Sequence, residues 1–217
     1  MPLDVTKAII LPRPKSLSAT DAASMPLVFL TAYTALTYYA VLPDPPKAEY
    51  RPSILVLGGS TGVGIFVLQI ATKRLQCEVV TTASTRNIEF VKSLGATKVI
   101  DYTKTSVVNG ALEYLPQGGY DAILDLVGGT ELIPHLNTLL KPQAPYVTIV
   151  GDKTNRHLIG GPAIYPLFPR MIARALLGYF GFGRKYYCIS FRLKEEYLKG
   201  MILSYSVNVN HSGSRNV

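Results

Sequence analysis

The sequence predicts an α/β protein built on a doubly wound, parallel, six-stranded sheet. From residue 53 onward, short apolar or β-branched runs alternate with segments whose apolar residues recur at helical spacing, which indicates strands joined by crossover helices. Four glycines, Gly58, Gly59, Gly62 and Gly64, lie where the first run meets the first helical segment. The composition is 48% hydrophobic and 17% charged, which indicates a globular chain with a sizeable core.

Ahead of this alternation the sequence predicts one long helix. Ser18 and Asp21 resemble a capping box in which Asp replaces Glu, and the apolar-rich residues 22–41 follow directly. Pro26 falls near the start of this segment, where a helix tolerates proline best. The proline-rich residues 43–52 then predict a surface loop that ends the helix.

The alternating region predicts six strands and the helices between them. Strands are expected at residues 53–58, 77–84, 97–102, 120–128, 144–151 and 185–190. Helices are expected at residues 62–75, 86–96 and 130–140, with Gly95 at the C-terminal end of the second. Because strands alternate with helices, the pairing is expected to be parallel and the crossovers right-handed.

The glycine cluster predicts an anion site at the first strand-to-helix turn. A helix N-terminus offers unpaired backbone N–H groups and the positive end of the helix dipole, and glycines allow a diphosphate to come close. Read as G-x-G-x-x-G from Gly59, the pattern has Thr61 at its second glycine, so part of the phosphate contact is expected from the threonine side chain. The alternative is a tight turn that holds no ligand.

The end of the second expected strand indicates which dinucleotide binds. An NAD site usually places an acid there to hold the ribose diol, but this strand ends in Ser84, Thr85, Arg86 and Asn87, and Glu78 lies at its opposite end. Hydroxyl and guanidinium groups suit a 2′-phosphate, so the sequence predicts NADP(H) as the cofactor. In the alternative, Ser84 caps the next helix and Arg86 is solvated.

These motifs together resemble one known family. The stretches "GGSTGVG…TTASTRNIEFVKSLGATKVIDY" and, upstream, "PLVFLTAYTAL" are similar to the medium-chain dehydrogenase/reductase superfamily, over roughly residues 8–200. Within it, they resemble the zinc-independent quinone oxidoreductase and enoyl reductase branch, including fungal zinc-type alcohol dehydrogenase-like proteins. The resemblance implies a Rossmann domain that binds NADPH and acts on a small-molecule substrate.

The turns and the resemblance together imply a set of cofactor-binding residues. They are Thr31, Gly59, Ser60, Thr61, Gly62, Val63, Gly64, Ser84, Thr85, Arg86, Asn87, Tyr102, Val127, Val150 and Gly151. Tyr102 is expected beside the adenosine phosphate, and Thr31 and Tyr33 on the nicotinamide and substrate side. Tyr33 is the one candidate for a catalytic proton donor, and protonation from solvent is the alternative.

The resemblance also implies how the chain is divided. In the family a catalytic barrel precedes the Rossmann domain, and the chain returns to it at the end. Residues 1–17 are therefore expected to be the tail of such a barrel, residues 18–200 the NADP-binding Rossmann domain and residues 201–217 an irregular tail. On this interpretation only remnants of the second domain are present, and one or both ends are truncated or altered.

No metal site is expected. Cys77 and Cys188 have no partner at ligand spacing, and His135, His157 and His211 are scattered. Cys77 is expected to be a small core or edge residue, and His135 a structural histidine. Two cysteines without a leader pattern favour a reducing compartment, so a cytoplasmic location is predicted, with a mitochondrial one as the alternative.

Basic residues are concentrated in residues 151–200. This segment holds nine Lys or Arg against three acids, which is six of the chain's eight net positive charges. Residues 161–187 combine aromatic and basic side chains, and we expect a helix that packs on the sheet or lines the substrate cleft with its arginines outward. Contact with a membrane surface is the alternative. Nucleic-acid binding is not expected, because no recognised module accompanies the charge.

The function predicted from these residues is an NADPH-dependent oxidoreductase, or the cofactor-binding portion of one. Hydride would pass to a quinone or to an α,β-unsaturated carbonyl or enoyl substrate. A non-catalytic module that binds NADPH is the second hypothesis, and a protein of the membrane surface the third. A homodimer is the assembly considered, and the sequence does not identify the substrate.

Overall fold

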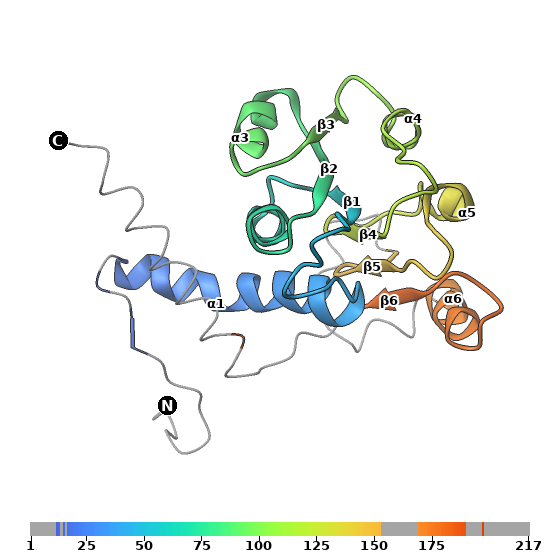
Figure 1. Cartoon of the computed structure of the whole chain (residues 1–217), viewed down its shortest axis with the longest axis horizontal. Helices are drawn as coiled ribbons and strands as arrows, with labels where there is room; N and C mark the ends of the chain where they lie inside the picture. Colours follow the sequence, from blue (N-terminus) through green and yellow to red (C-terminus); the bar gives the residue numbers. More distant parts are fainter. Residues whose placement is uncertain (1–11, 14, 16, 153–168, 190–196, 198–217) are drawn as a thin grey trace, which may run out of the picture.

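Six parallel strands form one sheet in the order β3-β2-β1-β4-β5-β6, which confirms the predicted fold class. The structure is a computed structural model that describes residues 12, 13, 15, 17–152, 169–189 and 197 (Figure 1). The strands are β1 (Ser53–Leu57), β2 (Glu78–Ala83), β3 (Lys98–Asp101), β4 (Ala122–Asp125), β5 (Tyr146–Thr148) and β6 (Tyr186–Cys188). All six lie within or beside the ranges expected from the sequence.

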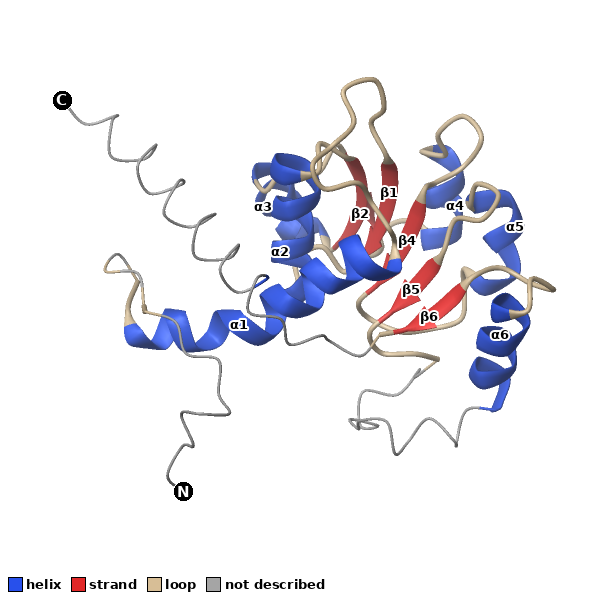
Figure 2. Cartoon of the chain, turned by 60° about the horizontal axis from the view of Figure 1, so that its bottom comes forward, coloured by secondary structure: helices blue, strands red, loops and turns tan. Residues whose placement is uncertain are grey.

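Helices cover both faces of the sheet (Figure 2). One layer contains α1 (Ala19–Thr34), α2 (Gly62–Gln69) and α3 (Ile88–Ser93), and the other contains α4 (Val107–Glu113), α5 (Leu136–Leu139) and α6 (Pro169–Tyr179). Side chains alternate along β1, so Ile54 and Val56 pack into the first layer and Leu55 and Leu57 into the second. Both faces are buried, which explains why the strands read as continuous apolar runs.

The first helix begins at the predicted cap. The Asp21 backbone N–H donates to Ser18 Oγ over 3.1 Å, and Ser18 Oγ donates to the Asp21 carboxylate over 2.6 Å. The Ser18 cap is therefore confirmed, although the Asp21 carboxylate accepts from the Ser18 hydroxyl, whereas a capping box would have it accept from the Ser18 backbone N–H. Helix α1 continues into a π-helical turn, Ala35–Tyr39, and α2 continues in the same way through Ile70–Arg74.

Helix α4 is the element that sequence reasoning missed. Its centre is Gly110, a poor helix former, and valines begin it. A Cβ at Gly110 would lie 2.5 Å from Ile100 Cγ2, so the glycine allows the helix to pack directly on β3. A glycine in the middle of a helix lowers helix propensity, but here it allows close packing on β3. Helix propensity alone therefore does not predict α4.

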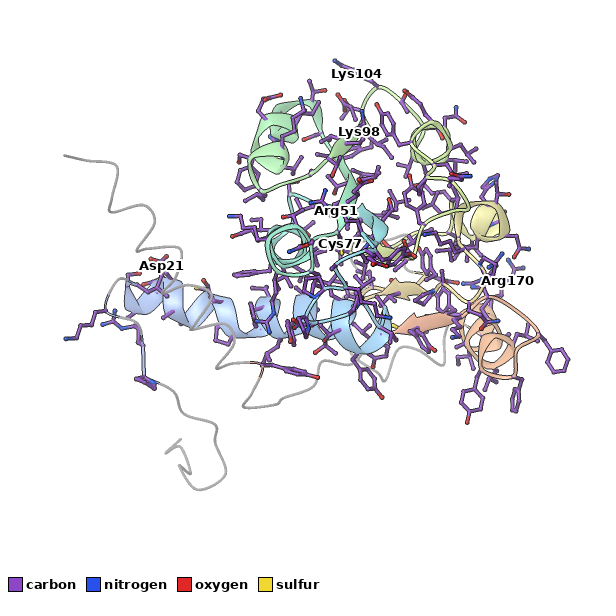
Figure 3. The ribbon with its side chains drawn as sticks, viewed as in Figure 1. Asp21, Arg51, Cys77, Lys98, Lys104 and Arg170 are labelled. Carbon is purple, nitrogen blue, oxygen red and sulfur yellow. The ribbon has the colours of Figure 1, made fainter. Side chains whose placement is uncertain are left out.

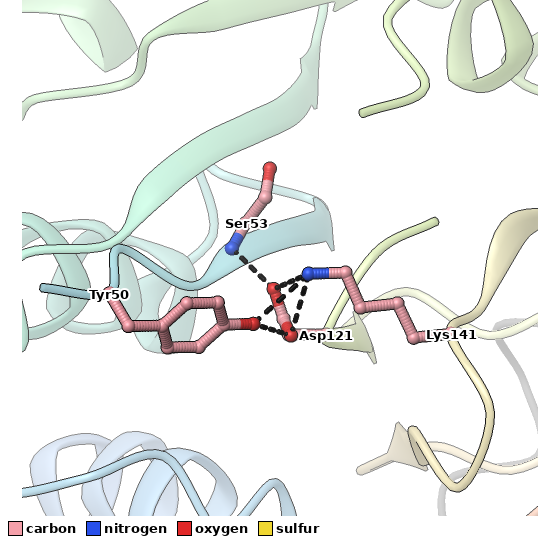
Figure 4. A network of polar contacts seen from close by, with 4 residues as sticks. All are labelled: Tyr50, Ser53, Asp121 and Lys141. Atoms are coloured by element: carbon pink, nitrogen blue, oxygen red, sulfur yellow. Dashed lines mark hydrogen bonds and ion pairs between the residues drawn. The ribbon is translucent and has the colours of Figure 1, made fainter. Parts of the chain in front are cut away.

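A polar cluster ties the loop before β1 to the sheet at the amino-terminal ends of the strands (Figure 4). Asp121 accepts the Ser53 backbone N–H at 2.8 Å and the Tyr50 hydroxyl, and Lys141 Nζ lies 3.0 Å from both of its oxygens. Lys141 Nζ also lies 5.2 Å from the centre of the Tyr50 ring. This cluster lies at the edge of the sheet opposite the expected cofactor site, and its residues are joined to one another.

The predicted domain limits stay predictions. The expected tail at residues 201–217 lies outside the described residues, and so does most of residues 1–17.

Candidate functional site

The glycine turn between β1 and α2 leaves two helix donors without an internal partner. Thr61 is the N-cap of α2, and its Oγ1 accepts the Gly64 N–H at 3.0 Å and donates to the Gly58 carbonyl at 2.8 Å. The Gly62 and Val63 N–H groups occupy the first turn, where no helical carbonyl precedes them. They are the kind of group that binds an anion. The Thr61 hydroxyl is used in capping α2, whereas the sequence analysis expected it to contact a phosphate.

Three of the four glycines are required by packing inside the protein. A Cβ at Gly64 would lie 2.2 Å from the Gly58 carbonyl oxygen, and one at Gly59 would lie 2.3 Å from Thr81 Oγ1. Gly58 has φ +90° and faces Val127, whose Cγ1 would be 2.6 Å from an added Cβ. At Gly62 the nearest atom to an added Cβ is 3.6 Å away. Neighbouring protein atoms therefore require glycine at three of these positions whether or not a ligand binds. Gly62 is the position where a side chain would have room.

The end of β2 lies beside this turn. Asn87 Nδ2 donates to Ser60 Oγ over 3.2 Å, so the structure joins two segments that the sequence assigned to one site. Ser84 stands at the cap position of the short 3₁₀ turn Thr85–Asn87, but its side chain makes no capping hydrogen bond. Arg86 is exposed, and its guanidinium has no ion pair or hydrogen bond with any residue that the structure describes.

A carboxylate that the sequence analysis did not assign to the site lies at the end of β3. Asp101 accepts the Thr85 hydroxyl at 2.5 Å and, with its other oxygen, the Thr103 hydroxyl at 2.6 Å and the Thr103 N–H at 3.0 Å. Hydrogen bonds from Thr103 and then Thr85 hold the pKa of Asp101 below its usual value. Tyr102, predicted to bind the cofactor, follows directly and is 55% exposed.

A buried acid and a buried hydroxyl hold the loops after β4 and β5. Asp125 is 1% exposed, and its Oδ1 accepts the N–H groups of Val127 at 3.1 Å and Gly128 at 2.8 Å. Its Oδ2 accepts the Thr148 hydroxyl at 3.0 Å, and Thr148 Oγ1 accepts the N–H groups of Val150 and Gly151 at 3.2 and 2.9 Å. Burial raises the pKa of Asp125, and the N–H donors oppose that rise.

Sequence reasoning named Val127, Val150 and Gly151 but missed the Asp125–Thr148 pair that positions them. The available signal was a polar residue at the end of each of two otherwise apolar strands.

Tyr33 lies away from the glycine turn. Its hydroxyl donates to Asp44 at 2.6 Å, and Arg74 Nε lies 2.9 Å from the same carboxylate oxygen. Arg74 ends the helix that starts at Gly62, about 18 Å along at 1.5 Å per residue. Burial and the bond to Asp44 raise the pKa of Tyr33 to about 12. The role of Tyr33 as proton donor stays a prediction, and its hydroxyl proton is shared with Asp44 in this structure. Thr31 Oγ1, predicted on the same side of the cofactor, donates within its own helix to the Leu27 carbonyl at 2.8 Å.

Helix α6 packs on the sheet, as expected. Met171 and Gly178 are buried, and Arg174 pairs with Asp152, whose Oδ1 accepts the Tyr186 hydroxyl at 2.9 Å. Arg170 is exposed as predicted (Figure 3). Arg174 instead pairs with Asp152 and Arg184 donates to Asn137 and Lys141, so the expectation of outward arginines is wrong for these two. Of the other basic residues labelled in Figure 3, Arg51 precedes β1, Lys98 lies in β3 and Lys104 follows β3.

Two sequence expectations concern metal and membrane. Among the described residues, no group of three or more His, Cys, Asp or Glu side chains could hold a metal ion, and we assign no metal-dependent step. His157 and His211 lie outside the described residues. In the same part of the chain, no helix has the length and apolar character needed to cross a membrane.

Comparison with known proteins finds relatives that are named as dehydrogenases and other oxidoreductases. Residues 62–176 match the family model described as zinc-binding dehydrogenase. A zinc-type alcohol dehydrogenase-like protein of Schizosaccharomyces pombe is 32% identical, covering 77% of this chain and 45% of that protein. The mitochondrial NAD(P)H oxidoreductase RTN4IP1 of Mus musculus is 42% identical, covering 64% of this chain and 34% of that protein. The trans-enoyl reductase pgmF of Aspergillus terreus is 36% identical, with coverages of 63% and 36%.

A solved structure agrees with these relatives. The quinone oxidoreductase from Coxiella burnetii superposes with a TM-score of 0.62 at 25% identity, covering 90% of this chain and 52% of that one. The chain spans between 34% and 45% of the length of the three curated relatives above.

Proposed function

This chain belongs to the zinc-binding dehydrogenase family, and we propose that it binds NADPH at the carboxyl-terminal ends of its strands as the cofactor-binding part of an oxidoreductase. The relatives named NAD(P)H oxidoreductase, quinone oxidoreductase and trans-enoyl reductase support a nicotinamide cofactor. The choice of NADPH over NADH is the finer part of the proposal and rests on the end of β2.

One observation carries the proposal. At the point where the strand order reverses, between β1 and β4, the free donors of α2 face the same edge as the ends of β2 and β3. Ligands of doubly wound sheets bind in the crevice at such a reversal. The Asn87–Ser60 hydrogen bond joins the glycine turn to the segment that carries Arg86, whose guanidinium has no partner among the described residues. A diphosphate at α2 and a 2′-phosphate at Arg86 suit these groups.

The residues proposed to hold the cofactor have separate roles. The Gly62 and Val63 N–H groups would bind the diphosphate, Arg86 and Ser84 the 2′-phosphate, and the Val127 and Val150–Gly151 loops would border the remainder of the dinucleotide. When bound, NADPH supplies a hydride to an acceptor. The chain's own contribution is to orient the cofactor and to keep water from it.

The substrate proposed is a quinone or an α,β-unsaturated carbonyl or enoyl compound. The names of the relatives support this class. No side chain among the described residues is assigned as proton donor, because the Tyr33 hydroxyl is bonded to Asp44. A cytoplasmic location and a homodimer stay predictions, and the relative named mitochondrial supports the alternative compartment.

A fluorescence titration with NADPH and NADH tests the cofactor assignment. Arg86→Ala removes the cation proposed to bind the 2′-phosphate, so we expect NADPH affinity to fall by about tenfold or more and NADH affinity to change by less than about twofold. Arg51→Ala is the matched control, because Arg51 is an exposed arginine before β1, at the opposite edge of the sheet.

Equal and weak binding of both nucleotides to the unmodified chain would contradict the proposal. A turnover assay with a simple quinone and an enone then separates the two hypotheses from the sequence. Oxidation of NADPH supports the oxidoreductase, and tight binding without turnover supports a module that binds the cofactor without catalysis.

A further inference from the structure

Asp101 is the one feature at the proposed 2′-phosphate corner that the proposed function does not explain. It ends β3, where it is directly in register with Ala83, the last residue of β2. Its carboxylate accepts the hydroxyl of Thr85, which stands between Ser84 and Arg86 in the segment proposed to bind the 2′-phosphate. A negative charge therefore lies within hydrogen-bonding distance of Thr85, the residue between the two that are proposed to bind the 2′-phosphate.

The Asp101 carboxylate has little hydrogen-bonding capacity left for a ligand. Both oxygens accept bonds from Thr85 and Thr103, three bonds in all, and Lys104 Nζ lies 4.0 Å from one of them. A ribose diol needs free acceptor positions on an acid, as in the usual NAD site. Asp101 is thus unlike that acid: what it presents to a bound nucleotide is mainly its charge.

Asp101 also keeps Thr85 from acting as a phosphate donor. A threonine hydroxyl carries one proton, and the Thr85 proton is donated to Asp101 over 2.5 Å. The side-chain donors left for a phosphate on this segment include the Ser84 hydroxyl, which makes no capping bond, and the Arg86 guanidinium, which has no partner among the described residues. The Lys104 side chain is 70% accessible to solvent. Water and salt therefore weaken its attraction to Asp101, and Lys104 neutralises little of the negative charge of that carboxylate.

We propose that Asp101 is a specificity-determining residue that limits the preference of this chain for NADPH over NADH. It repels the 2′-phosphate by its charge and withholds the Thr85 hydroxyl from it. The inference rests on the proposed nucleotide site and adds to it: Arg86 draws the 2′-phosphate in, and Asp101, on the neighbouring strand, opposes that attraction.

The test is nucleotide binding by Asp101→Asn, which removes the charge and retains an oxygen that can accept from Thr103. We expect the Kd for NADPH and for 2′,5′-ADP to fall about fivefold, because the variant removes one unit charge near a phosphate dianion in a water-exposed setting. The Kd for NADH and for 5′-AMP should change by less than about twofold. The difference should shrink at about 1 M salt, where the Debye length is about 3 Å.

Two further variants separate charge from hydrogen bonding. They are Thr85→Val alone and Thr85→Val combined with Asp101→Asn. Thr85→Val alone should leave NADPH affinity nearly unchanged, because Asp101 already takes the Thr85 proton and the Thr103 hydroxyl is its other neighbour, 2.9 Å away. In the combined variant the gain of Asp101→Asn should shrink to the part that is due to charge alone. Glu78→Gln is the matched control, since Glu78 is an exposed carboxylate at the other end of β2 and its neutralisation should leave the NADPH-to-NADH ratio unchanged.

The outcomes are distinguishable. A ratio of NADPH to NADH affinity that is the same in Asp101→Asn as in the unmodified chain overturns this inference and leaves the nucleotide site standing. An equal gain in Glu78→Gln also overturns it, because the effect would then be one of net charge. Absence of nucleotide binding in the unmodified chain overturns the proposed function and this inference with it. Circular dichroism checks that each variant keeps the fold.

Discussion

Burial changes the chemistry of a single side chain at Cys77. The residue precedes β2 and is 7% exposed within the core of the α1–α3 layer, which agrees with the small core or edge residue expected from the sequence. Burial raises the pKa of its thiol to about 12, and the charge of Asp121 adds to the rise. The thiolate is the reactive form, so Cys77 should be inert in the folded protein.

A thiol-labelling experiment at pH 8 checks this expectation. In a Cys188→Ser background, Cys77 should react with a disulfide reagent at least about a thousandfold more slowly in the folded protein than in urea. With a pKa of about 12, the small thiolate fraction of Cys77 should rise about tenfold per pH unit from pH 7 through pH 10, and the labelling rate should rise with it, whereas the rate of a free thiol levels off above its pKa of about 8.5. Rapid labelling in native buffer would contradict the assigned burial.

At the scale of an element, the β1–α2 turn depends on which glycines face backbone. A Cβ at Gly64 would lie 2.2 Å from the Gly58 carbonyl oxygen, a backbone atom that cannot rotate away. Gly62 faces open space apart from Val28 at 3.6 Å. The two glycines look alike in the sequence, but only Gly64 lies where a side chain would collide with backbone.

Alanine substitution at these two positions should therefore have opposite effects. Gly64→Ala should lower the free energy of unfolding by about 2 kcal/mol or more, because α2 must move away from the end of β1. Gly62→Ala should leave stability unchanged or raise it by up to about 1 kcal/mol, because alanine is the better helix former. Urea unfolding followed by circular dichroism measures both, and similar losses in the two variants would count against the packing described here.

At the scale of the whole molecule, one buried network holds together the carboxyl-terminal edge of the sheet. Asp125 and Thr148 end neighbouring strands, and between them they accept four backbone N–H groups from the two loops that follow. Loss of the carboxylate would leave three donors without their acceptor: the N–H groups of Val127 and Gly128 and the hydroxyl of Thr148.

Asp125→Ala should accordingly lower the free energy of unfolding by about 3 kcal/mol, since each buried group left unsatisfied costs about 1–3 kcal/mol. Thr148→Val should cost a similar amount, because it also breaks two N–H bonds, those of Val150 and Gly151, and the shared bond to Asp125. In hydrogen exchange measured by mass spectrometry, both variants should increase exchange in the loops after β4 and β5 together. Increased exchange in one loop alone would show that the network does not couple them.

Much of the fold could be predicted from the sequence. Strand positions follow from the apolar runs, and the start of α1 follows from Ser18 and Asp21, because these signals act within a few residues of each other. Helix α4 could not be predicted, because the reason for glycine at position 110 is its close packing against Ile100 of β3, a contact that the local sequence does not show. For the site, Ser60 and Asn87 were both named from the sequence, and the structure joins them through a hydrogen bond.

Tertiary structure alone decided which side chains share a corner. The sequence by itself determined an alternating α/β chain with a glycine turn and a basic, hydroxylated segment at the end of β2, because each is a local pattern. It could not place Asp101 beside Thr85, Asp125 beside Thr148 or Tyr33 beside Asp44, at separations of 16, 23 and 11 residues. Those contacts depend on strand register and helix packing, which bring together residues that no local pattern relates.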